Sequence, residues 1–147
     1  MKRKINYLVS LLACLMVSVC MFTGCSLFSK VFAPADAVVV ETTETCVVIK
    51  VEKAQENQTL LDVMKSLQEA EKISYTLSGT MVNGINGKEN PADFSSCWML
   101  YTSDAEMANT DWGTYTYNDA VYGSAILGAD ALLVVDGGYY VWVYTTF

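Results

Sequence analysis

The residues in this sequence that could do chemistry are mainly aromatic, and six of them fall between positions 98 and 122. Planar side chains offer a large contact area at low entropy cost, which suits flat ligands and protein hot spots. Gly123 and Ser124 lie beside them and could bring backbone amides to a ligand. The candidate ligand-binding residues are therefore Trp98, Tyr101, Trp112, Tyr115, Tyr117, Gly123 and Ser124.

The alternative for each aromatic residue is packing in a core or in a cross-strand pair. We favour packing for Trp98 and Trp142, which lie in strongly apolar stretches. For Trp112, Tyr115 and Tyr117, close to a polar loop, both roles stay open.

Catalytic motifs are missing from the sequence. It contains no histidine, which excludes Ser-His-Asp and Cys-His machinery, and it has no Gly-rich phosphate loop. Asp104, Glu106, Asp111 and Asp119 crowd one region, but their spacing is not that of a calcium-binding EF-hand. We expect these acids to be a solvated surface, the protein not to be an enzyme, and neither a metal nor a cofactor to be required.

The N-terminal segment has the features of an export signal. Lys2, Arg3 and Lys4 precede an apolar run over residues 8–22, shorter than the roughly 20 residues of a comfortable membrane span. The run ends in the sequence Phe-Thr-Gly-Cys, which resembles a bacterial lipoprotein lipobox ending at Cys25. The resemblance implies that Cys25 is lipidated and anchors an extracytoplasmic protein to the bacterial cell membrane. An uncleaved transmembrane anchor is the alternative.

The mature chain, residues 25–147, would be strongly acidic. It keeps six lysines and all sixteen acids, a net charge of −10. Such a surface repels phosphate backbones and anionic lipid, so we expect no nucleic-acid partner and membrane contact through the anchor alone.

Two cysteines, Cys46 and Cys97, remain outside the signal and the lipobox. In an oxidising compartment they could form a disulfide, or they could be two small buried hydrophobic residues. Sequence alone does not decide the pairing.

The chain divides into a signal peptide at 1–24, a lipidated tether at 25–44 and a domain at 45–147. Residues 38–40 are either an edge strand or an apolar patch. Thr59 and Asp62 form a capping pattern, and the apolar residues that follow have helical spacing, which predicts a helix over 60–71. Strands are predicted over 46–51, 73–77, 80–85, 97–102, 113–117, 120–123 and 139–144.

Turns and irregular segments complete the pattern. Asn118 and Asp119 predict a two-residue hairpin turn, and residues 103–112 read as irregular. The alternation in 139–144 predicts a closing strand in mid-sheet, with Tyr140 and Trp142 on one face and Val141 on the other. One helix with six to eight strands predicts an α+β domain, in which the helix covers one face of a mixed or antiparallel sheet.

Three segments, at 59–64, 97–101 and 136–144, together resemble the transcobalamin-like C-terminal domain found in bacterial surface lipoproteins. The resemblance implies a β-grasp-like mixed sheet packed on one amphipathic helix, with an extra hairpin. It also implies capture of a small ligand, first a corrinoid such as cobalamin, and delivery of that ligand to a membrane transporter. Gly138 departs from the acid usual in the family, and the family's helical barrel is missing. The alternative is a cell-surface protein-interaction module without a small ligand.

Overall fold

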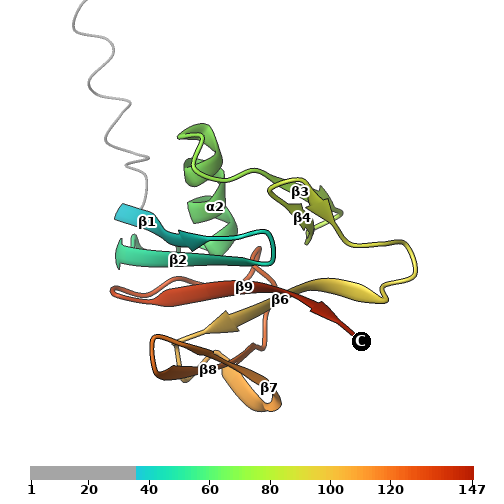
Figure 1. Ribbon diagram of the computed structural model, residues 1–147. Helices are drawn as coiled ribbons and strands as arrows, with labels where there is room; N and C mark the ends of the chain where they lie inside the picture. The colour runs from blue at the N-terminus through green and yellow to red at the C-terminus, as the bar shows by residue number, and fades with distance from the viewer. Residues whose placement is uncertain (1–35) are drawn as a thin grey trace, which may run out of the picture. The chain divides into compact units, whose positions relative to one another are not determined.

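The computed structural model describes residues 36–147, which form an α+β fold rich in antiparallel sheet (Figure 1). The larger sheet has six strands in the order β1-β2-β9-β6-β8-β7, and a smaller sheet has the order β3-β4-β5. The elements are β1 (Asp36–Thr42), β2 (Cys46–Lys53), α2 (Leu60–Glu69), β3 (Tyr75–Ser78), β4 (Met81–Ile85), β5 (Lys88–Glu89), β6 (Ser96–Thr102), β7 (Ala108–Tyr117), β8 (Ala120–Ala125) and β9 (Tyr139–Thr146).

The direction of the strands differs from the sequence prediction. Each pairing between named strands within residues 36–147 is antiparallel. The predicted mixed sheet is therefore wrong. The mixed sheet was part of the resemblance, whereas the helix and strand pattern also allowed the antiparallel sheet that is observed. After α2 the chain enters the separate small sheet.

The helix α2 starts at the predicted cap and ends two residues before the predicted boundary. The Asp62 amide donates to the Thr59 hydroxyl at 3.2 Å, and the Thr59 amide donates to the Asp62 carboxylate at 3.1 Å. This reciprocal pair satisfies amides that the first helical turn leaves unpaired. The four residues of the predicted apolar stripe are buried: Leu60, Val63, Met64 and Leu67.

The six-stranded sheet has a hydrophobic cluster on each face. The helix-side core joins α2 to residues such as Ile49, Leu100 and Tyr140. The opposite cluster, here called the tyrosine cluster, consists of Cys46, Val48, Tyr101, Tyr122 and Val141, with Met99, Tyr115, Tyr117, Ala120, Tyr139 and Val143 packed against it.

Strand β9 supplies both clusters, as its alternation predicted. Tyr140 and Trp142 lie in the helix-side core, and Val141 lies in the tyrosine cluster. The strand is hydrogen-bonded to β2 on one side and to β6 on the other, so it is in mid-sheet. A strand buried on both faces accounts for the continuous apolar sequence.

The N-terminal edge of the sheet reaches further than the predicted start of the domain at residue 45. Asp36–Thr42 forms β1 and pairs with β2, so the last part of the predicted tether is an edge strand. Residues 36–147 belong to one compact unit, and both hydrophobic clusters consist of residues in this range. This unit therefore contains the core that it needs to fold.

The β7–β8 hairpin is longer than predicted. Asn118 and Asp119 have φ of 48° and 62° and form the predicted two-residue turn between Tyr117 and Ala120. Residues 108–112, predicted to be irregular, belong to β7. The pairing shifts between Asn109 and Thr114, where Gly113 has φ of 130°. This bulge and the polar side chains of an edge strand hide the strand pattern in the sequence.

Candidate ligand-binding site

The predicted ligand-binding residues do not meet in one site. Trp98 is 5% exposed and belongs to the helix-side core. Its indole N–H donates to the Lys88 carbonyl at 2.7 Å, and its ring meets that of Tyr144 edge-on at 5.4 Å. Packing, which the sequence favoured for Trp98, is therefore its observed role.

The predicted tyrosines lie on the other face of the sheet. Tyr101 and Tyr115 have ring centroids 5.8 Å apart, and Tyr117 lies 6.4 Å from Tyr139. The Tyr115 hydroxyl donates to the Cys46 sulfur at 3.8 Å. These rings pack against one another and cover the sheet, so they form a core of their own.

The remaining predicted residues are separated from one another. Trp112 is 63% exposed on β7. At Gly123 an added Cβ would lie 3.0 Å from the Ala108 side chain and 3.3 Å from the Asn109 backbone, so this glycine allows close strand packing. Ser124 is buried opposite Tyr101.

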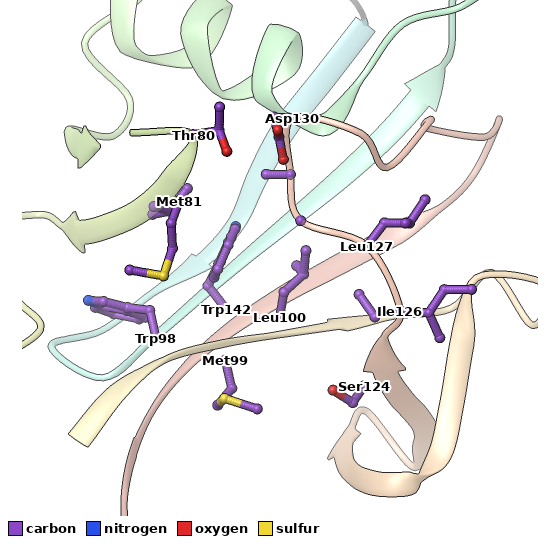
Figure 2. A pocket seen from close by; sticks show the side chains of 14 residues that line it. Thr80, Met81, Trp98, Met99, Leu100, Ser124, Ile126, Leu127, Asp130 and Trp142 are labelled. Carbon is purple, nitrogen blue, oxygen red and sulfur yellow. The ribbon is translucent and has the colours of Figure 1, made fainter. Parts of the chain in front are cut away.

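A pocket of about 450 Å³ lies between β4, β6 and the segment that follows β8 (Figure 2). Of the predicted residues only Trp98 and Ser124 line it. Its other lining residues are Thr80, Met81, Val82, Met99, Leu100, Ala125, Ile126, Leu127, Gly128, Ala129, Asp130 and Trp142.

The segment that closes the pocket is held by the start of helix α2. The Leu60 amide donates to the Leu132 carbonyl and the Leu61 amide donates to the Ala129 carbonyl, both at 2.8 Å. Ala129 and Leu132 are buried in the helix-side core. These contacts satisfy amides of the first helical turn and fix the segment as one wall of the pocket.

The pocket is apolar at its rim and has a buried aromatic floor. Met81, Ile126 and Leu127 are 40–46% exposed, whereas Trp98 and Trp142 are each 5% exposed. Figure 2 shows Trp142 between Met81 and Leu100, with Thr80 and Asp130 at one end of the pocket. Such a lining suits an apolar ligand oriented by a few polar groups.

Sequence analysis missed most of this pocket. Its wall at 126–130 is outside every strand and helix, so no periodic pattern marks it. The available signal was the apolar pair Ile126 and Leu127 next to the Gly128 turn, where a turn would ordinarily be polar.

Cys46 and Cys97 are both free thiols. They lie on β2 and β6 with β9 between them, and Cys46 is opposite Val143 whereas Cys97 is opposite Thr145. Burial raises the pKa of both thiols. For Cys46 the Tyr115 hydrogen bond acts in the opposite direction and the Glu41 charge adds to the increase.

Several predictions concern features beyond this site. The signal peptide and the lipidation site Cys25 lie outside the described residues. Within residues 36–147 no helix is long and apolar enough to cross a membrane. In the same range no three Cys, Asp or Glu side chains group as a metal site would require.

The comparisons with known proteins identify no relative: no family model, curated protein or solved structure matches the chain.

Proposed function

We propose that this chain is a lipid-anchored extracytoplasmic binding protein that captures a small molecule in the pocket between β4, β6 and residues 126–130. The observation that carries the proposal is the pocket itself, whose rim leaves Met81, Ile126 and Leu127 exposed above a buried aromatic floor. Its volume of about 450 Å³ falls in the range of small-molecule sites. Exposed apolar side chains around a concavity are typical of a ligand site.

The proposed role is binding without catalysis. Asp130 is the one ionisable residue in the pocket lining, so the site lacks the paired groups of acid–base chemistry. The proposed anchor is Cys25, on the strength of the lipobox-like sequence, which would hold the domain outside the cell membrane.

A corrinoid such as cobalamin is the first ligand class to test, because of the resemblance to the transcobalamin-like domain. We also propose that the domain is related to the β-grasp fold. The packing of the six-stranded sheet against helix α2 supports this relationship. A corrinoid would lie over the apolar rim and place only part of its structure in the pocket. Delivery to a membrane transporter would follow capture.

The test is tryptophan fluorescence of residues 26–147 titrated with cobalamin, cobinamide and haem. Trp98 and Trp142 line the pocket, so a bound chromophore should quench emission saturably. Met81→Lys should abolish the quenching, because it places a charge at the rim. Val121→Lys is the matched control, since Val121 is 64% exposed on β8 and is not among the lining residues. If none of the three compounds quenches beyond the inner-filter correction, the corrinoid assignment is wrong.

A second candidate function is docking of a surface protein through the β7–β8 hairpin. The observation that favours it is the exposure of two large apolar side chains, Trp112 at 63% and Val121 at 64%. Cross-linking on intact cells tests it: a specific cross-linked partner should be lost in Trp112→Ala and kept in Met81→Lys. The opposite pattern would assign the partner to the pocket.

A further inference from the structure

We infer that the part of the ligand that enters this pocket is uncharged and largely apolar and carries a hydrogen-bond acceptor that pairs with the indole N–H of Trp142. The inference rests on the proposed function, because it names the ligand class for the same pocket. Its basis is a difference between the two tryptophans of the floor.

Trp98 and Trp142 are buried to the same extent but differ in their hydrogen bonds. The Trp98 N–H donates to the Lys88 carbonyl. The Trp142 N–H is buried and has no acceptor within the described residues. An unpaired buried donor is costly, and natural folds nearly always satisfy such groups. A partner from outside the chain would remove the cost, and Trp142 lines the pocket where that partner would enter.

Access to the N–H requires a side chain to move, because protein atoms cover the nitrogen. Met81 is the suitable side chain. It is 46% exposed at the rim and lines the same pocket as Trp142. Methionine is unbranched and has three rotatable bonds, so it changes rotamer at little cost.

The charge around the pocket selects against an anion. Asp130 stands at one end of the lining, and residues 25–147 carry a net charge of −10. A carboxylate would satisfy the indole N–H but would be repelled by these charges. A carbonyl, ether or hydroxyl oxygen satisfies the same donor without a charge.

Three naphthalene probes of similar size test the inference on residues 26–147. They are 2-acetylnaphthalene, which carries a neutral acceptor, 2-ethylnaphthalene, which lacks one, and 2-naphthoate, which is anionic. Binding is followed by the indole N–H signals in nitrogen-edited NMR spectra, with Trp142 assigned through the β9 backbone. We expect the acetyl compound to bind about tenfold more tightly than the ethyl compound and to shift the Trp142 signal selectively.

Trp142→Phe keeps an aromatic ring and removes the donor. In this variant the preference for acetyl over ethyl should shrink to about twofold or less. If Trp142→Phe does not fold, the selective shift of the Trp142 signal in the unaltered chain decides the question. Equal affinity for acetyl and ethyl probes without that shift overturns the acceptor assignment and leaves the proposed pocket in place. If no probe binds and no pocket signal moves, both the inference and the pocket as a site for apolar ligands are overturned.

Discussion

The two faces of the six-stranded sheet are covered in different ways. The helix-side face is covered by α2, an element separate from the sheet, whereas the tyrosine cluster is covered by the sheet's own β7–β8 hairpin (Figure 1). β2 and β7 are four steps apart in the strand order, about 19 Å in a flat sheet. Yet Tyr115 on β7 reaches Cys46 on β2. The sheet therefore curls until its edge lies over its own face.

The two hydrophobic clusters also differ in the types of residue that they contain. The helix-side core consists mainly of aliphatic residues with Trp98, Tyr140 and Trp142, and nine of its described side chains are fully buried. The tyrosine cluster consists largely of rings that combine an apolar body with a polar tip, which suits a half-open face. We therefore expect the helix-side core to determine most of the stability and the tyrosine cluster to tolerate substitution.

The largest expected effect is that of Leu60→Ala in the helix-side core. Leu60 is fully buried, so truncation leaves a cavity and should lower the free energy of unfolding by about 2–5 kcal/mol. Urea unfolding of residues 26–147 measures it. Leu133→Ala is the control, because Leu133 is 46% exposed and its loss should cost less than about 0.5 kcal/mol. Equal losses of unfolding free energy in the two variants would contradict the expectation that the helix-side core determines most of the stability.

A pair of Tyr→Phe substitutions compares the two faces directly. The buried Tyr140 hydroxyl accepts from the Val135 amide at 2.9 Å, so Tyr140→Phe leaves that amide unpaired and should cost about 1–3 kcal/mol. Tyr115→Phe removes only the long contact to the Cys46 sulfur and should cost less than about 1 kcal/mol. Thermal and urea unfolding of both variants measure the difference. A larger loss for Tyr115→Phe would reverse the ranking of the faces.

Gly113→Ala tests the curl of the hairpin. The φ of 130° at Gly113 is strained for any other residue, so the substitution should cost about 1–2 kcal/mol. It should also draw Tyr115 away from Cys46 and speed the reaction of that thiol with a disulfide reagent. Cys97, on β6, is the internal control and should react at its original rate. Unchanged labelling of Cys46 would show that the bend does not depend on this glycine.

The effect of pH should be the smallest and should appear only in alkali. Burial raises the pKa of Cys46, and it also raises the pKa of Tyr140. The folded state then holds these protons more tightly than the unfolded state, so their stabilisation is complete at neutral pH and is lost as pH rises above about 9. Each group contributes a slope of at most about 1.4 kcal/mol per pH unit. In Cys46→Ala the free energy of unfolding should fall less steeply as pH rises in the alkaline range. An unchanged slope would show that Cys46 does not contribute to this pH dependence.

Local signals in the sequence predicted much of the fold. The Thr59 and Asp62 capping pair located α2, and Asn118 with Asp119 located the hairpin turn, because each motif acts within a few residues. The alternation in β9 predicted which side chains reach which face. Contacts between distant segments could not be predicted in this way.

The pocket and the curl of the sheet are the main features that depend on such distant contacts. The pocket wall is placed by hydrogen bonds from Leu60 and Leu61 to carbonyls some seventy residues later in the chain, at Leu132 and Ala129. In the tyrosine cluster, Tyr115 follows the bulge at Gly113 and reaches across the sheet to Cys46. Neither arrangement produces a periodic pattern in the sequence, so the sequence identified the aromatic candidates by residue type but did not predict that they lie on opposite faces of the sheet.

The position of β9 also determines when the fold can be completed during synthesis. A chain made from its N-terminus produces β2 and β6 long before β9, and each then has an unpaired side where β9 will later insert. Local hairpins such as β7–β8 form within microseconds, but no strand pairing joins the two halves of the large sheet until β9 is made. A chain interrupted before residue 139 would lack the strand that joins those halves, together with side chains from both hydrophobic clusters. Such fragments would expose sheet edges that pair readily with one another, and aggregation rather than partial folding is their expected fate.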